Sequence, residues 1–158
     1  MVLIKDGRRR ELAGGFRRTT NNRMEIMGVI VGLRCVREPH ARITVYSDSR
    51  YVVDMLNGGY VVQWRRHGWT RNRGKDAVLN RDLWEELLNL CAGRKVDFAW
   101  VRGHTANREN ERCDELAVQA RQAGNLPPDT GYESPGGTAP ATPLAPSAPP
   151  QQLTLFDS

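Results

Sequence analysis

The chain has 158 residues, of which 39% are hydrophobic and 26% are charged, and its formal net charge is +5. This length has room for one ordinary soluble domain plus an extension. No apolar run approaches the ~20 residues that a membrane span needs. The apolar start at 1–4 is too short for a signal sequence, because the charged segment 5–10 follows it at once. We therefore expect a cytoplasmic protein without a membrane anchor, and its positive charge is compatible with a polyanionic partner.

The first third of the chain predicts a hairpin, a helix and a strand. Residues 1–4 and 11–16 are expected to form two short strands joined by a polar turn that contains Gly7. Thr20 or Asn21 can cap a helix over about 22–37. Its apolar side chains recur at helical spacing and form one stripe: Met24, Met27, Ile30 and Val31.

Two acids stand out in this part of the chain. Glu25 lies beside the apolar stripe, on a helix line that otherwise holds Gly28 and Gly32. A bare face lets a helix lie close to a sheet, where a carboxylate is costly unless it is paired or bound to a metal. The alternative is that Glu25 is a surface acid at the edge of the apolar stripe. Asp48 ends the predicted strand 42–48, where open α/β sheets place their ligands, and a short helix is expected to follow it as far as Gly58.

Residues 60–81 have a different character. They hold six cations against the single acid Asp76, and Trp64 and Trp69 lie among them. Clustered cations beside aromatic rings are typical of a surface that binds a nucleic-acid backbone. A solvated basic helix whose tryptophans belong to the core explains the same pattern equally well.

The second half predicts a helix over 79–91, a strand over 96–101 and a helix over 109–123. The loop before the last helix holds His104, and Asp114 adjoins that helix's apolar face. Converging carboxylates such as Glu25, Asp48 and Asp114 would repel one another unless cations joined them. Oxygen ligands suit Mg²⁺ or Mn²⁺, and two such ions can assist phosphodiester hydrolysis. Spacing alone leaves open whether the acids converge.

Four segments carry a resemblance to a known family. They are Thr-Thr-Asn-Asn-Arg-Met-Glu at 19–25, Tyr-Ser-Asp-Ser at 46–49, Trp-Val-Arg-Gly-His at 100–104 and Glu-Asn-Glu-Arg-Cys-Asp-Glu-Leu-Ala at 109–117. In order and spacing they resemble the signature segments of bacterial ribonuclease HI, and the similarity runs to about Tyr132. Integrases and junction resolvases share the fold but match these segments less well.

The resemblance implies a mixed sheet flanked by helices, in an α/β domain spanning 1–133. It implies hydrolysis of the RNA strand of an RNA/DNA hybrid, with two Mg²⁺ or Mn²⁺ ions, to leave 5′-phosphate and 3′-hydroxyl ends. Glu25, Asp48 and Asp114 would bind the metal, and His104 would help proton movement or product release. The positions matched to nucleic-acid contacts are Thr20, Asn21, Asn22, Arg50, Trp64, Arg65, Arg66 and Trp69.

The chain departs from the family pattern at two places. The family's first strand, which carries a fourth catalytic aspartate, has no counterpart, because residues 1–4 align with the strand after it and Asp6 lies in the following turn. A start codon placed too far downstream, or a truncation, would explain this. The alternative function is then a module that binds hybrids without cutting them. Arg50 stands where relatives commonly carry glutamine.

The last residues have the composition of a tether. Residues 134–150 are rich in proline and predict a disordered linker. Residues 151–158 resemble the short peptide by which bacterial proteins bind the DNA sliding clamp, through Gln152, Leu153, Leu155 and Phe156. A fortuitous apolar end is the alternative. We expect a monomer apart from such partners.

Overall fold

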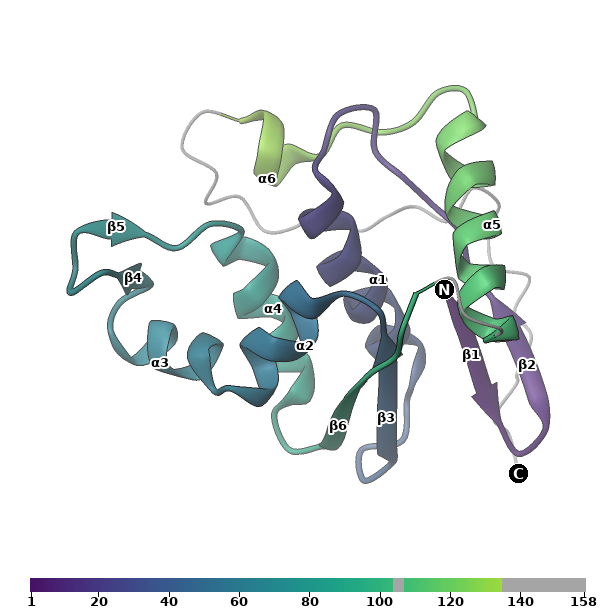
Figure 1. Ribbon diagram of the computed structural model, residues 1–158, viewed down its shortest axis with the longest axis horizontal. Coiled ribbons are helices and arrows are strands. Elements are labelled where there is room, and N and C mark those ends of the chain that lie inside the picture. The colour runs from purple at the N-terminus through teal and green to yellow at the C-terminus, as the bar shows by residue number, and fades with distance from the viewer. Residues whose placement is uncertain (104–106, 135–158) are drawn as a thin grey trace.

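The computed structural model describes residues 1–103 and 107–134 (Figure 1). His104, nearly all of the predicted linker and the whole clamp-binding-like peptide lie outside the described residues. The helices are α1 Asn21–Cys35, α2 Arg50–Asn57, α3 Tyr60–Arg66, α4 Arg81–Cys91, α5 Arg108–Gln122 and α6 Thr130–Glu133. The strands are β1 Val2–Lys5, β2 Arg8–Glu11, β3 Arg42–Ser47, β4 Thr70–Arg71, β5 Asp76–Ala77 and β6 Lys95–Trp100.

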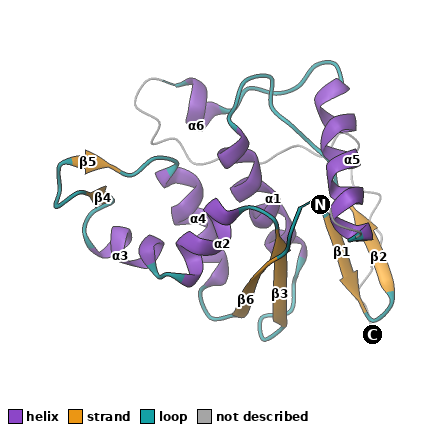
Figure 2. Ribbon diagram, in the orientation of Figure 1, coloured by secondary structure: helices purple, strands orange, loops and turns teal. Residues whose placement is uncertain are grey.

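The strands form three pairs of mixed orientation (Figure 2). β3 and β6 run parallel, with Ile43 opposite Val96 and Val45 opposite Phe98. β1 and β2 form an antiparallel hairpin, as do β4 and β5. Among the described residues, no hydrogen-bonded ladder joins β1 to β3. The predicted α/β class with helices around mixed strands is confirmed.

The core lies between the central helices and the β3–β6 pair. α1 packs against α4, and α2 contacts β6. α1 begins at Asn21 because the Thr20 hydroxyl accepts a hydrogen bond from the backbone N–H of Arg23 at 3.3 Å, as an N-cap does. The largest side chains with almost no exposure are Trp84, Ile26, Met27, Ile30, Leu33, Leu83 and Leu87. The apolar stripe of α1 therefore faces inward, as its spacing predicts.

The bare face of α1 meets two different environments. A Cβ built on Gly32 would lie 2.8 Å from Cε of Met1, so a residue next to β1 lies close against the helix there. A Cβ on Gly28 would meet nothing within 4 Å. The close approach that the glycines predict is therefore made at Gly32 and not at Gly28.

The second strand is corrected by the structure. It runs over Arg8–Glu11 rather than 11–16, because residues 12–16 form no strand. Asp6 and Gly7 both have positive φ, at 49° and 74°, as a two-residue hairpin turn requires. That turn pairs Lys5 with Arg8, so the return strand begins there. Elements α3, β4 and β5, within the basic segment 60–81, were not predicted individually.

Candidate active site

Glu25 lies close enough to Asp48 for the charge of Asp48 to act on it. Glu25 is on the first turns of α1 and Asp48 follows the end of β3. Burial raises the pKa of Glu25, and the negative charge of Asp48 raises it further. A hydrogen bond donated by the Ser49 hydroxyl acts in the opposite direction. The pair is therefore partly desolvated, which favours binding of a cation between the two carboxylates.

Asp48 is held from two further elements. The indole Nε1 of Trp100, at the end of β6, donates to the backbone oxygen of Asp48 at 3.1 Å. The amide Nδ2 of Asn110, in the first turn of α5, donates to Asp48 Oδ2 at 3.2 Å. A Cβ built on Gly103 would lie 2.9 Å from the same Oδ2. The loop after β6 and the start of α5 therefore close around this carboxylate.

Asp114 lies four residues after Asn110, so the two side chains project from the same face of α5. It is partly buried. Within residues 1–103 and 107–134, however, no three histidine, cysteine, aspartate or glutamate side chains lie close enough to hold one metal ion. Glu25 and Asp48 thus lie near one another, and Asn110, one turn before Asp114 on α5, reaches the Asp48 carboxylate. Carboxylate oxygens still fit a hard divalent cation.

Comparisons with known proteins show the family to which the chain belongs. The family model described as RNase H matches residues 1–122. A ribonuclease H of Rippkaea orientalis is 53% identical over 135 residues, which are 85% of this chain and 82% of that relative. A ribonuclease HI of Synechocystis is 48% identical over 132 residues, covering 84% of this chain and 81% of its own length. This chain belongs to the ribonuclease H family.

Solved structures of the family are also similar. LC9-RNase H1, a type 1 ribonuclease H with the type 2 active-site motif, is 37% identical with a TM-score of 0.57, and the match covers 65% of this chain and 48% of that one. A foamy viral protease-reverse transcriptase in complex with an RNA/DNA hybrid shares the fold, with a TM-score of 0.58 at 18% identity over 66% of this chain and 14% of its own. The family match is to type 1 enzymes, which generally use divalent metal ions.

The residues matched to nucleic-acid contacts in the ribonuclease H family differ in exposure. Asn21, Asn22, Arg50, Arg65 and Arg66 are exposed, and so is Thr20, whose hydroxyl caps α1. Trp64 is partly buried and its ring lies 6.4 Å from that of Trp84. Trp69 is only 5% exposed. The burial of both rings favours the alternative that these tryptophans belong to the core, whereas the arginines face solvent.

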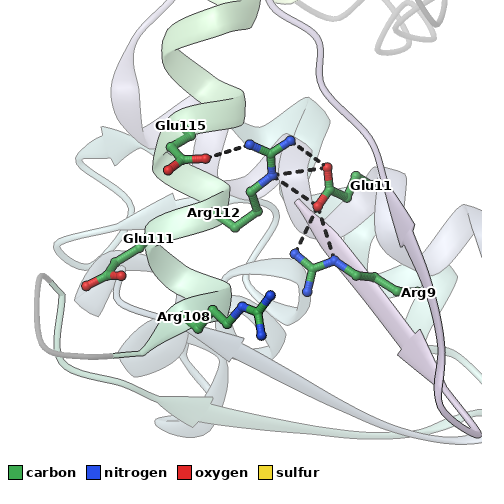
Figure 3. Close-up of a pocket in the computed structure, with 6 residues that line it drawn as sticks. All are labelled: Arg9, Glu11, Arg108, Glu111, Arg112 and Glu115. Atoms are coloured by element: carbon green, nitrogen blue, oxygen red, sulfur yellow. Dashed lines mark hydrogen bonds and ion pairs between the residues drawn. The ribbon is translucent and has the colours of Figure 1, made fainter.

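A pocket of about 300 Å³ lies elsewhere on this ribonuclease H, between β2 and α5 (Figure 3). Arg112 donates to Glu11 at 2.9 to 3.1 Å and also contacts Glu115. Hydrogen bonds from Arg112, and then from Arg9, lower the pKa of Glu11 to about 2. The remaining residues around the pocket are Arg108 and Glu111. This network fixes the β1–β2 hairpin against the helix that carries Asn110 and Asp114.

Sequence reasoning missed the side chains that hold the acids. Ser49 could have been recognised as a helix cap, since it precedes α2 and accepts from the N–H of Val52 at 3.3 Å. Asn110 and Trp100 carry no local signal, because their contacts join residues 62 and 52 positions away from Asp48. Within the described residues, no helix is both long and apolar enough to cross a membrane.

Proposed function

We propose that Glu25, Asp48 and Asp114 are the carboxylates with which this ribonuclease H hydrolyses the RNA strand of RNA/DNA hybrids. The products are 5′-phosphate and 3′-hydroxyl ends. The cofactor is Mg²⁺ or Mn²⁺, with two ions per site. The observation that carries the proposal is the half-buried Glu25 beside Asp48, in a chain that matches the family over residues 1–122.

The chain's own residues prepare this site. Ser49 donates to the Glu25 carboxylate, while Asn110 and Trp100 hold Asp48. When bound, divalent ions supply positive charge to the phosphodiester and to its attacking and leaving oxygens. For His104, next after Gly103 in the chain, we propose a role in proton movement or product release. Gly103 lies against the carboxylate of Asp48.

We propose that the hybrid is held by the exposed polar and basic residues that match the family's contact segments. Asn21 and Asn22 begin α1, close in sequence to Glu25. Arg65 and Arg66 end α3 and are exposed. Phosphate contacts of this kind supply affinity without sequence preference. In this proposal Trp64 and Trp69 pack in the core and hold in place the segment that carries Arg65 and Arg66. We propose that the enzyme acts in the bacterial cytoplasm, where RNA/DNA hybrids form.

We further propose that a strand encoded upstream fits between β1 and β3 and supplies the fourth acid of the family pattern. β1 is paired with β2 alone and β3 with β6 alone in the described part of the chain. Ile4 is 60% exposed and Tyr46 is 68% exposed, on strands where apolar residues are usually covered. The alternative function follows if that strand is absent, because the chain then binds hybrids with little or no cutting.

The tail provides a second proposal. Gln152, Leu153, Leu155 and Phe156 bind the DNA sliding clamp, and residues 134–150 serve as the tether. A peptide of residues 151–158 should bind purified clamp in an anisotropy titration. Replacement of Leu155 and Phe156 by alanine should abolish binding, and equal binding by both peptides would exclude this function.

The decisive experiment is cleavage of a labelled RNA/DNA hybrid with Mg²⁺ and then with Mn²⁺. The Asp48→Asn variant is the control, and circular dichroism checks that both proteins are folded. Cutting by the parent chain that Asp48→Asn abolishes supports the proposed function. Binding without cutting by the folded parent supports the alternative. Cutting that survives Asp48→Asn would contradict the assigned site.

A further inference from the structure

We propose that Arg50, held against the ring of Trp100, forms a phosphate-binding subsite beside the carboxylate pair. This inference rests on the proposed function, because it assigns one contact of the same substrate. The subsite would bind a phosphodiester group of the hybrid's backbone. Its components come from separate elements, since Arg50 begins α2 and Trp100 ends β6.

The geometry holds the guanidinium in one place. The Cζ atom of Arg50 lies 3.9 Å from the centroid of the Trp100 ring. The indole is itself fixed, because its Nε1 donates to the backbone oxygen of Asp48 at 3.1 Å. Stacking uses the flat face of the guanidinium and leaves the N–H groups at its edge free to donate. Arg50 is thus oriented by a residue that also contacts the segment carrying Asp48.

The charge of Arg50 remains available for a ligand. Within the described residues its Nη1 lies 3.9 Å from Asp54 Oδ1, and both side chains are well exposed, at 65% and 50%. Arg112, by contrast, donates to Glu11 at 2.9 Å. An exposed pair at nearly 4 Å contributes little, because water screens it. A phosphate group can therefore bind the Arg50 guanidinium without breaking a strong ion pair.

A phosphodiester is the ligand that this position favours. The backbone of the hybrid is negatively charged and must approach Glu25 and Asp48, which are negatively charged themselves when ionised. A fixed cation two residues after Asp48 offsets that repulsion. The forked guanidinium donates to two phosphate oxygens at once, whereas a sugar or a base gains less from its charge.

The test measures binding in EDTA, so that metal-dependent cleavage does not enter. Labelled 18-base-pair RNA/DNA hybrid and the same sequence as duplex DNA are titrated by anisotropy over a salt series. Arg50→Gln should weaken binding of both by roughly 2- to 10-fold, because a contact between charges at an exposed side chain is screened by water. It should also reduce the slope of log Kd against log salt by about one.

Three further variants test the stack and its specificity. Arg50→Lys should keep the salt slope yet lose affinity, since lysine does not stack in the same way. Trp100→Leu should weaken binding in the parent but not in the Arg50→Gln background, as expected for two coupled residues. Arg121→Gln is the matched control. Arg121 is an exposed arginine on α5, 11 residues beyond Asn110 and so about 16 Å further along the helix.

Each outcome decides the proposal. An Arg50→Gln variant with the parent's affinity and salt slope overturns it, and so does a loss no larger than that of Arg121→Gln. A loss confined to the hybrid overturns the assignment to phosphate and favours a sugar contact. If the parent binds neither nucleic acid and cuts nothing with Mg²⁺, the proposed function fails with it. If the parent binds and cuts normally, the proposed function stands, and the Arg50→Gln result tests the phosphate-binding subsite alone. Trp100→Phe replaces Trp100→Leu if the latter fails to fold.

Discussion

Arg23 is the side chain whose loss should cost this fold most. It lies on α1 with 4% of its side chain exposed, and Asp82 and Asp129 beside it are 4% exposed as well. Its guanidinium donates to both oxygens of Asp129 at 2.7 and 2.9 Å, and to both oxygens of Asp82 at 2.9 and 2.6 Å. Burial lowers the pKa of Arg23, but the hydrogen bonds to the two aspartates outweigh it and raise the pKa. One buried cation thereby joins α1, α4 and the start of α6.

Arg23→Met should lower the free energy of unfolding by about 3–5 kcal/mol, because two buried carboxylates would lose their cation. Asp129 would keep the hydrogen bond from the Thr19 hydroxyl at 2.6 Å. The expected loss is a large share of the ~5–15 kcal/mol that holds a typical domain together. It corresponds to a fall of about 10 °C or more in Tm for a domain of this size. Urea unfolding followed by circular dichroism measures the change at pH 7. The packing volume of methionine limits the loss of apolar contact.

The matched control is Arg17→Met. Arg17 also reaches α6, donating to Glu133 at 2.7 Å, but its side chain is 59% exposed. That exposed pair should contribute far less to stability, because water screens it. Adding Asp82→Asn and Asp129→Asn to Arg23→Met should recover part of the loss. The reasoning is refuted if Arg23→Met costs no more than Arg17→Met, or if the added amides recover nothing.

Three other substitutions test the site and its supports. Gly103→Ala would place a Cβ 2.9 Å from Asp48 Oδ2, so the rate of hybrid cleavage should fall by roughly 10- to 100-fold with Tm nearly unchanged. The control is Gly124→Ala, whose Cβ would meet nothing within 4 Å and which should cut at the parent's rate. Equal cleavage rates for the two variants would contradict the contact between Gly103 and Asp48. Gly28→Ala should raise the free energy of unfolding by about 0.5–1 kcal/mol, since alanine favours the helix and its Cβ meets nothing within 4 Å. A lower free energy of unfolding in urea would show instead that another part of the protein covers this face of α1. The pKa of Glu11 is about 2 in the folded chain and 4.5 ordinarily, so the ionised Glu11 stabilises the fold above pH 4.5 and this stabilisation is lost as pH falls toward 2. The difference in free energy of unfolding between the parent and Glu11→Gln should therefore shrink over that range. A difference that stays constant with pH would refute the role of the ion pairs.

The helices were predictable because their stripes are regular. The predicted helix at 22–37 is α1, Asn21–Cys35, and the predicted helix at 109–123 is α5, Arg108–Gln122. Periodic burial fixes such elements from local information. The segment 60–81 was not resolved into elements. Its backbone turns at Trp69, Asn72 and Arg73, all with positive φ between 52° and 62°. Asparagine tolerates this conformation, whereas Trp69 does not favour it and is only 5% exposed, so packing rather than local preference sets its backbone.

The candidate acids could be selected from the sequence, but the side chains around them could not. Glu25 and Asp48 could be selected because each adjoins a predicted buried face at an element's end. Ser49 and Asn110 hold these acids through contacts between separate elements. The partners of Arg23 lie 59 and 106 residues away in sequence. A single sequence contains no signal for such pairs, since it shows local periodicity and not which elements meet.

The position of Asp114 follows from how α5 is attached. α5 contacts β1, and Arg112 ties it to Glu11 of the hairpin (Figures 1 and 3). Asp48 instead follows β3, which no ladder joins to the hairpin within the described residues. Apart from the hydrogen bond from Asn110 to Asp48, the placement of Asp114 relative to Glu25 and Asp48 therefore depends on the spacing between these two units. An added strand between β1 and β3 would fix that spacing and contribute an acid at once. Extending the chain upstream should thus raise Mg²⁺ affinity and cleavage together in calorimetry and hybrid assays. A rise in thermal stability without tighter Mg²⁺ binding would mean that the strand completes the sheet but not the metal site.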